Sequence, residues 1–569
     1  MTTSDLPPYP PIDPTTFDLI IIGTGLPASL ISAASSAAGK SVLHLDPNPF
    51  YGSHFSSLSV PDISSFLNSH SAPPFNTHDE NLTLTTRPLF SDVEISNFAP
   101  EILDQHLRKF NLDLSGPRVL FCADKSIDLM LKSGASQYVE FKSVDASLVG
   151  DGDGKLWSVP DSRAAIFKDK TLSLLEKNQL MRFFKLVQGH LSNDESEESE
   201  NGVKISAEDL ESLFVEFLTK MKLPPKIKSI ILYAIAMADY DQENMVVRKG
   251  LLKTKDGIDR LTLYIASVGR FQNALGALIY PIYGQGELAQ AFCRRAAVKG
   301  CLYVLRMPVI SLLKDEDSGS YKGVRLASGQ DVFSQKLVLD PSFTVPGPLA
   351  SAPCEQIQDS CQVLSLIDDK VKVARGICIT KSSLKPDISN CLVFFPPRSL
   401  FPEQVTSIRV LQLSSNLAVC PLGMFVLYFS ALCDEVNQGK KLLHAALNAL
   451  MKLLVSGNAE NSSTVQSEDT EHVEPTLLWS ALYIQELTKG QFESVSSTPM
   501  PDGNLNYNDL LDATEKVLRF HIFVKFVSSI NCSTHYHFTS LVLASLMCSP
   551  ALGVLYFISW IVNMYVSKS

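Results

Sequence analysis

A strand, a glycine-rich turn, a helix and a second strand within residues 17–46 constrain the fold of this chain more than any other feature. Residues 17–22 form an apolar run that ends at Gly23, which is typical of a parallel strand buried on both faces. A helix is predicted over 27–38, and a second strand over 41–46 ends in an acidic residue. This order predicts an α/β fold class: a Rossmann-like, FAD/NAD(P)-binding domain of the oxidase type, built from more than one sheet and interrupted by an inserted α-helical domain.

The turn itself has lost parts of a nucleotide site. Gly23 and Gly25 would let the backbone approach a pyrophosphate at the helix N-terminus. Ala28 replaces the third glycine, and Asp46 leads into 47–52, where flavoproteins of this type usually carry a Gly-Gly-Arg pattern. No late Gly-Asp segment, acid–base pair or activated nucleophile is evident in the sequence. We therefore predict a vestigial nucleotide-binding turn, no bound cofactor and no catalytic residues.

Charge and cysteine content exclude several classes of function. The chain has 49 Lys plus Arg against 60 Asp plus Glu, and its net charge of −11 argues against a nucleic-acid partner. Its 11 Cys show neither a CxxC pair nor a Cys/His cluster at zinc spacing, so no metal site is predicted. No secretory signal precedes the first strand. We expect a cytosolic protein with reduced thiols.

The chain of 569 residues is long enough for two or more domains. Residues 163–191 and 207–240 have helical spacing, and a charged stretch without apolar side chains separates them. The predicted divisions are a flexible lead at 1–16, a discontinuous α/β domain at 17–158 and 272–518, an α-helical domain at 159–271 with a disordered acidic loop at 192–203, a second disordered loop at 456–474 and an atypical hydrophobic tail at 519–569. Strands are predicted at 335–340 and 408–413.

Two long motifs resemble one protein family. Residues 18–27 (DLIIIGTGLP) and 42–52 (VLHLDPNPFYG) are similar to the first sequence block of the Rab GDP-dissociation inhibitors and escort proteins, and 280–295 (YPIYGQGELAQAFCRR) to their second block. Shorter segments at 156–160, 231–237 and 256–257 also fit, so the resemblance spans about 17–518. The acidic insertion, Gly-Gln-Gly at 284–286 and the segment 478–485 look like a plant escort protein.

The resemblance implies a non-catalytic accessory component of Rab geranylgeranyltransferase. It implies that the α/β domain binds GDP-bound Rab GTPases, presents them to the transferase α/β heterodimer and shields the attached geranylgeranyl groups until transient membrane contact. The positions that match the Rab-binding platform of the family are Tyr51, Glu287, Arg294 and Tyr303. Arginine can pair with a carboxylate through two hydrogen bonds, and tyrosines can bury ring area while their hydroxyls stay bonded. Without the resemblance, Glu287 and Arg294 would be interpreted as part of a solvated helix face, and Tyr51 and Tyr303 as core residues.

For the helical domain, the resemblance implies docking to the transferase and a groove for the isoprenoid. Phe214, Phe217 and Leu218 are candidate groove residues. An apolar stripe at this spacing is more often ordinary core. Two other functions stay open: a Rab GDP-dissociation inhibitor, and an FAD-dependent oxidoreductase whose glycine turn holds the flavin.

The C-terminal tail has its own character. No Lys, Arg, Asp or Glu occurs from Phe526 to Val566, and residues 541–566 are long enough to cross a bilayer core of about 30 Å. Two interpretations stay open: a membrane tail anchor, and translated sequence from a variant transcript or gene-model error.

Overall fold

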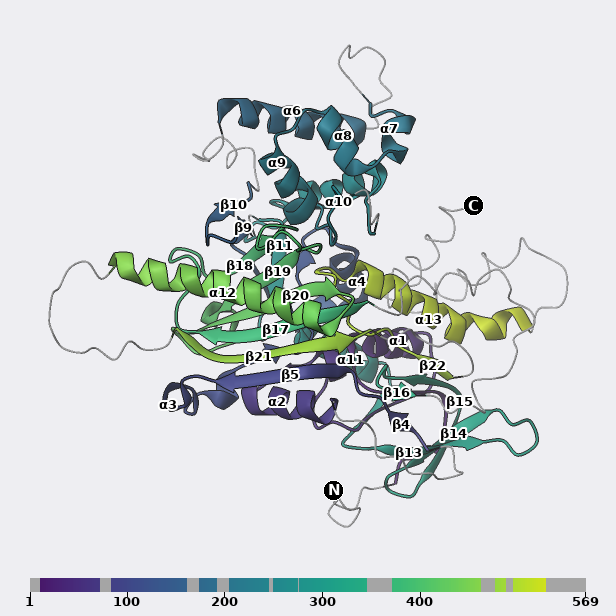
Figure 1. Cartoon of the computed structure of the whole chain (residues 1–569). Helices are drawn as coiled ribbons and strands as arrows, with labels where there is room; N and C mark the ends of the chain where they lie inside the picture. Colours follow the sequence, from purple (N-terminus) through teal and green to yellow (C-terminus); the bar gives the residue numbers. More distant parts are fainter. Residues whose placement is uncertain are drawn as a thin grey trace.

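The computed structural model describes residues 11–71, 83–160, 173–191, 204–244, 249–274, 276–344, 371–461, 476–487 and 495–528. The loop expected at 192–203, most of the loop expected at 456–474 and the apolar segment 541–566 lie outside these ranges. The described chain forms two large sheets, with a group of helices standing at one end (Figure 1). Among the helices described, none combines the length and apolar character needed to cross a membrane.

The first sheet carries the glycine turn. Its strands are β1 (Thr16–Ile22), β2 (Val42–Asp46), β12 (Leu302–Leu305), β13 (Val309–Lys314), β14 (Tyr321–Leu326), β15 (Asp331–Leu339) and β22 (Val495–Ser497). They lie in the order β12-β2-β1-β15-β14-β13, with β22 paired to β15. β1 is parallel to both β2 and β15. Helix α1 (Leu26–Ala37) follows the turn, so the predicted Rossmann-like order of strand, turn, helix and strand is confirmed.

Strand β1 is apolar at almost every position because both faces of its sheet are covered. Ile20 and Ile22 pack on one face with Leu43 of β2. Ile21 packs on the opposite face, in a core built with α1, α11 (Gly286–Val298) and α13 (Asn508–Ser528). An alternating strand would have placed polar side chains in one of these cores. Helix α13 runs past the domain boundary expected at 518.

The segment just before β1 corrects a prediction. Residues 1–16 were expected to be a flexible lead, but Ile12 is buried in the core beneath β1. Its backbone N–H donates to the side-chain carbonyl of Gln330 at 2.8 Å, and its carbonyl accepts from the Gln330 amide at 2.8 Å. Ile12 is a lone apolar residue among prolines, so the sequence around it shows no periodicity. Only its contact with Gln330 in the folded protein reveals that this segment is ordered.

The second sheet is larger and mostly antiparallel. Its strands are β5 (Phe90–Asn97), β9 (Ala146–Gly150), β10 (Leu156–Ser158), β17 (Lys372–Thr380), β18 (Cys391–Phe395), β19 (Ile408–Ser414), β20 (Phe425–Cys433) and β21 (Leu477–Glu486), in the order β10-β9-β18-β19-β20-β17-β21-β5. Helix α12 (Val436–Asn461) lies along one face of it (Figure 1). Residues 456–461 belong to α12, so the prediction of a loop over 456–474 is wrong for these residues. The helix continues because each residue added to an established helix gains a hydrogen bond.

Shorter elements connect the two sheets. They are β3 (Ser57–Leu58), β4 (Thr85–Thr86), β6 (Leu112–Asp113), β7 (Leu120–Phe121), β8 (Phe141–Ser143), β11 (Leu278–Pro281), β16 (Phe343–Thr344), α2 (Val60–Ser69), α3 (Pro100–Leu103), α4 (Lys125–Ser133), and the 3₁₀ turns η1 (Ser53–Phe55), η2 (Leu107–Lys109), η3 (Ala135–Tyr138) and η7 (Ser415–Leu417). β3 pairs with β6, and β11 pairs with β7 and β8.

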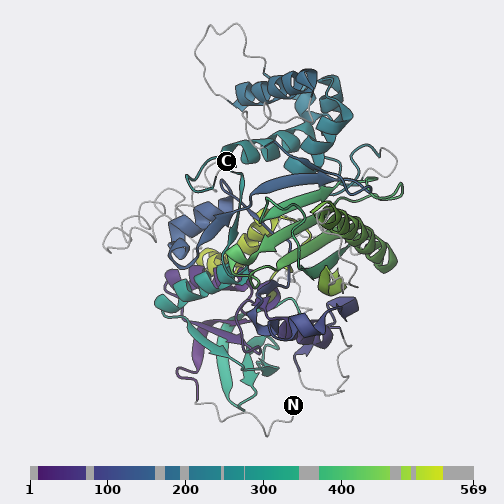
Figure 2. The same cartoon turned by 90° about the vertical axis from the view of Figure 1, so that its left-hand side faces the viewer.

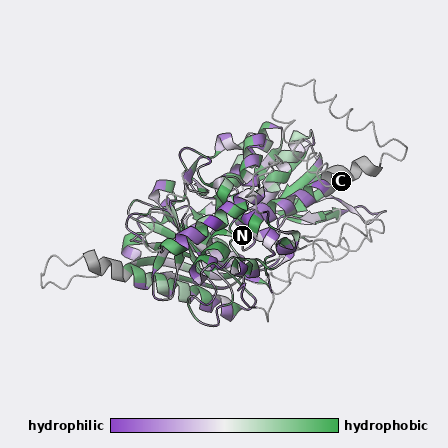
Figure 3. Ribbon diagram, turned by 90° about the horizontal axis from the view of Figure 1, so that it is seen from above, coloured by the Kyte–Doolittle hydropathy of each residue, from purple (hydrophilic) through white to green (hydrophobic). Residues whose placement is uncertain are grey.

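The described chain between β10 and β11 is mainly helical and stands at one end of the molecule (Figure 2). Its elements are α6 (Leu174–Leu191), α7 (Ala207–Glu211), α8 (Phe214–Lys220), α9 (Pro225–Ser229), the π-helical turn η4 (Ile230–Ile235) and α10 (Thr254–Ser267). Hydrophilic and hydrophobic residues alternate along the helices (Figure 3), as expected for helices with one buried face. The candidate groove residues Phe214, Phe217 and Leu218 are all buried, in a core that the helical unit shares with the second sheet.

Candidate functional site

The glycine turn after β1 uses its polar groups internally. Gly23 has a φ of +92°, in the left-handed region that favours glycine. The carboxylate of Asp46 accepts hydrogen bonds from the Thr24 N–H (2.7 Å), the Thr24 hydroxyl (2.6 Å) and the Asn48 N–H (2.8 Å). The N–H of Gly52 donates to the Thr24 hydroxyl at 2.9 Å. Asp46 thus binds its own turn, where a nucleotide-binding acid would bind a ribose.

A buried carboxylate, Asp340 at the end of β15, stands directly against this turn. A Cβ placed on Gly23 would lie 2.6 Å from the Cβ of Asp340. Asp340 accepts hydrogen bonds from the hydroxyls of Ser53 (2.5 Å) and Ser342 (2.6 Å) and pairs with Nε2 of His54 at 3.1 Å. Burial alone would raise the pKa of Asp340, but the His54 charge and the hydrogen bonds from His54, Ser342 and Ser53 hold it well below its usual value.

The side chains around the turn do not fit an FAD pyrophosphate. Phosphate binding at a helix N-terminus depends on free N–H groups and positive potential. Here Asp340 and Asp46 place two carboxyl groups at the turn, and burial, opposed by hydrogen bonds within the turn, raises the pKa of Asp46 to about 6. A Cβ on Gly25 would lie 3.4 Å from the Phe55 ring, and Ala28 is buried at the start of α1. At this turn, side chains of the protein itself bind the polar groups and lie against the two glycines.

Two of the predicted platform residues, Tyr51 and Tyr303, lie together. Their rings meet edge to face, with centroids 5.9 Å apart, and the Tyr303 ring also lies 4.8 Å from that of His44. The Tyr303 hydroxyl is 2.9 Å from the Ser32 hydroxyl on α1. Burial raises the pKa of both tyrosines, and the thiol of Cys293 raises it further. Tyr303 thus packs against Tyr51, and the Tyr303 hydroxyl is directed toward α1.

The other two predicted residues, Glu287 and Arg294, lie on α11. Glu287 is half-buried and accepts a hydrogen bond from the Gln290 amide at 3.1 Å. Burial raises the pKa of Glu287, while the Arg294 charge lowers it. Arg294 is exposed, and its guanidinium carbon lies 5.9 Å from the centroid of the Tyr138 ring in η3. The guanidinium edge can therefore pair with a carboxylate of a partner while its plane rests near an aromatic ring.

The structure therefore brings the four predicted residues together as two pairs. Cys293, the neighbour of Arg294 in sequence, is buried and raises the pKa of both tyrosines. Tyr138 and Gln290 were not among the site residues predicted from the sequence. The spacing of Gln290 from Glu287, three residues along a helix, could have indicated the contact. Tyr138 carries no such signal, because η3 and α11 are far apart in sequence.

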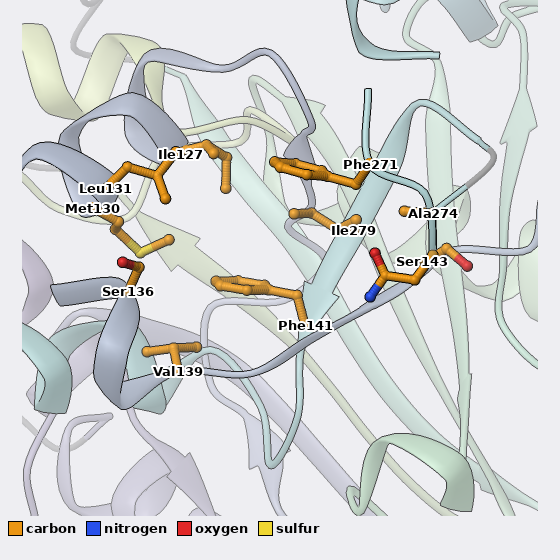
Figure 4. A pocket seen from close by; sticks show the side chains of 11 residues that line it. Ile127, Met130, Leu131, Ser136, Val139, Phe141, Ser143, Phe271, Ala274 and Ile279 are labelled. Atoms are coloured by element: carbon orange, nitrogen blue, oxygen red, sulfur yellow. The ribbon is translucent and has the colours of Figure 1, made fainter. Parts of the chain in front are cut away.

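An apolar cavity of about 220 Å³ adjoins this surface at η3 (Figure 4). Its lining includes Ile127, Met130, Val139, Phe141, Phe271 and Ile279, from α4, η3 and its C-cap, β8, β11 and the segment after α10. Leu131 at its rim is 52% exposed. Val139 directly follows Tyr138, so the cavity lies beside the turn that Arg294 contacts. Over the described residues, no cluster of three or more His, Cys, Asp or Glu side chains could hold a metal ion.

Comparison with known proteins identifies the relatives of this chain. The sequence model of one family, GDP dissociation inhibitor, matches residues 13–80 and 75–468. Rab escort protein 1 of Arabidopsis thaliana is 61% identical over 529 residues, which cover 90% of this chain and 94% of the relative. The Rab proteins geranylgeranyltransferase component A of Drosophila melanogaster is 30% identical to this chain. The match covers 73% of this chain and 74% of the relative.

A solved structure with the same fold is that of Rab GDI from Plasmodium falciparum. It superimposes with a TM-score of 0.61 at 19% sequence identity, and the match covers 89% of this chain and 98% of that chain. At this identity, the likeness shows the fold alone. The sequence prediction of an oxidase-type α/β scaffold agrees with it.

Proposed function

Because this chain belongs to the GDP dissociation inhibitor family, where it groups with the Rab escort proteins, we propose that it is a carrier for Rab GTPases. It binds unprenylated Rab in the GDP-bound form and presents it to the Rab geranylgeranyltransferase α/β heterodimer. It then shields the geranylgeranyl groups in the cytosol until a transient contact with the membrane. It carries out no catalysis of its own.

One observation carries the proposal: the glycine turn binds its polar groups within the chain, while α11, which shares a core with α1, carries Glu287 and Arg294. Asp340, which accepts hydrogen bonds from Ser53 and Ser342, lies directly against Gly23 of this turn. On α11, Arg294 is exposed and Glu287 is only half-buried. A carboxylate of a protein partner would pair with Arg294, and a basic side chain of that partner would pair with Glu287. Tyr51, braced by Tyr303, adds an aromatic contact of the kind enriched in the centre of interfaces.

Shielding is needed because a geranylgeranyl group exposes apolar area to water at a cost of roughly 25 cal/mol per Å². In the helical unit, Phe214, Phe217 and Leu218 are packed core. Their place in an isoprenoid groove, which would need these helix faces to part, stays a prediction, and the helical unit is proposed as the part that meets the transferase.

A reconstituted prenylation assay tests the function. With purified transferase, an unprenylated GDP-bound Rab and geranylgeranyl diphosphate, addition of this protein is expected to start incorporation of label into the Rab. A dissociation inhibitor would bind prenylated Rab but would not support incorporation, so absence of label would overturn the proposal. A flavin oxidoreductase would reveal itself by visible absorbance of the purified protein, or by retention of added FAD after gel filtration. We expect neither.

The apolar cavity is proposed to take an aliphatic side chain of the bound GTPase. Ser143 lines it from β8, opposite Ile279 of β11. Replacing Ser143 by Phe should fill part of the 220 Å³ and weaken binding of a fluorescent GDP-bound Rab about tenfold. Ser143→Ala is the matched control and should bind as the wild type does. Equal binding by the Phe variant, with an unchanged melting temperature, would show that the cavity is not part of the interface.

A further inference from the structure

The N-terminal end of α11 is held by two side chains from distant parts of the sequence. Asp113 and Ser57 lie opposite each other in the short pair of β6 and β3. The Asp113 carboxylate accepts hydrogen bonds from the Gln285 N–H at 2.9 Å, the Ser57 hydroxyl at 2.6 Å and the Tyr280 hydroxyl. The Ser57 hydroxyl in turn accepts from the Gly286 N–H at 2.9 Å. Two N–H groups at the start of α11 are therefore bound by groups outside the helix.

The approach is so close that only glycine fits. Gly284 has a φ of +102°, and a Cβ there would lie 2.4 Å from the Ser57 hydroxyl oxygen and 2.7 Å from the Asp113 carboxylate. A Cβ on Gly286 would lie 2.8 Å from the Ser57 backbone nitrogen. Glu287 comes directly after this turn. The first turn of the helix that carries Glu287 and Arg294 is therefore held at Asp113 and Ser57.

Resting on the proposed function, we propose that Asp113 and Ser57 are positioning residues for GTPase capture. Neither is proposed to touch the GTPase, since Asp113 is 1% exposed and Ser57 donates into the interior. They direct Glu287 and Arg294 by holding the first turn of α11. Preorganisation of this kind raises affinity because less conformational freedom is lost on binding.

The acid at position 113 suits this role better than an amide would. Burial raises the pKa of Asp113 to about 7, opposed by the hydrogen bonds from Ser57 and Gln285. The three groups around its two oxygens, including the Tyr280 hydroxyl, all donate. An Asn would point an N–H₂ group at one of these donors and leave it without an acceptor. Because Asp113→Asn could disturb folding, Ser57→Ala is the gentler test.

Ser57→Ala is expected to weaken capture of a fluorescent GDP-bound Rab about tenfold, equivalent to about 1.4 kcal/mol. The matched control is Ser212→Ala in the helical unit, where a half-buried hydroxyl donates to the Asp209 carbonyl at 2.7 Å. The control should bind as the wild type does. Thermal melts of both variants show whether any loss of affinity merely follows stability.

A double-mutant cycle separates positioning from general destabilisation. In the wild-type background, Ser57→Ala is expected to lower Rab affinity about tenfold. If Ser57 acts through Glu287, the same substitution should lower Rab affinity at most about threefold in a Glu287→Ala background. Equal losses in both backgrounds, or no loss in either, would overturn the inference. Failure of the wild-type protein to bind Rab would instead overturn the proposed function, so the two failures are distinguishable.

Discussion

Replacing Arg294 by Glu is expected to weaken capture of a GDP-bound Rab about 100-fold, equivalent to about 3 kcal/mol. Arg294 is exposed on α11, so the substitution changes the surface without disturbing the core. A glutamate there would face the proposed partner carboxylate with a like charge and would also repel Glu287 on the same helix. The measurement is a titration of fluorescent GDP-bound Rab, repeated at two salt concentrations.

Lys299 provides the control for this substitution. It is exposed at the C-terminal end of α11, so Lys299→Glu changes the net charge of the protein by the same amount. We expect that variant to lose little affinity. If both variants bind Rab equally well, or lose affinity equally, Arg294 has no specific contact with the GTPase and the proposed platform is wrong.

Replacing Phe214 by Ala is expected to destabilise the helical unit by about 3–5 kcal/mol, the usual cost of truncating a buried Phe. Phe214 is 0% exposed at the start of α8. It lies so close to α10 that a Cβ on Gly257 would approach its ring to 2.5 Å. Prenylation in the reconstituted assay should fall at least about tenfold, because the unit proposed to meet the transferase is lost in part of the population.

Rab capture by the Phe214→Ala variant should change by less than about twofold, because the platform residues lie on the α/β part of the chain. Hydrogen exchange should quicken in α8 and α10 while α1 and α11 stay protected. Phe214→Leu, which keeps most of the apolar volume, is the control and should prenylate nearly as well as the wild type. Equal loss of capture and prenylation would show that the helical unit does not act separately from the platform.

Much of the fold could be predicted because its signals are local. β1, the glycine turn, α1 and β2 follow one another within 16–46, and each has its own pattern of apolar side chains. The strands predicted at 335–340 and 408–413 correspond to β15 and β19. Prediction failed at Ile12, whose order depends on the distant Gln330, and also at the first residues of the loop expected at 456–474, which continue α12.

The sequence by itself determined the family, the scaffold and the loss of the cofactor motif, since these depend on residues that are neighbours along the chain. Only the tertiary structure decided that Asp340, which directly follows β15, lies against Gly23 of the turn. It also decided that Asp113 and Ser57 hold α11. The physical reason is that a buried carboxylate is tolerated only where donors converge on it, and those donors come from segments far apart in sequence.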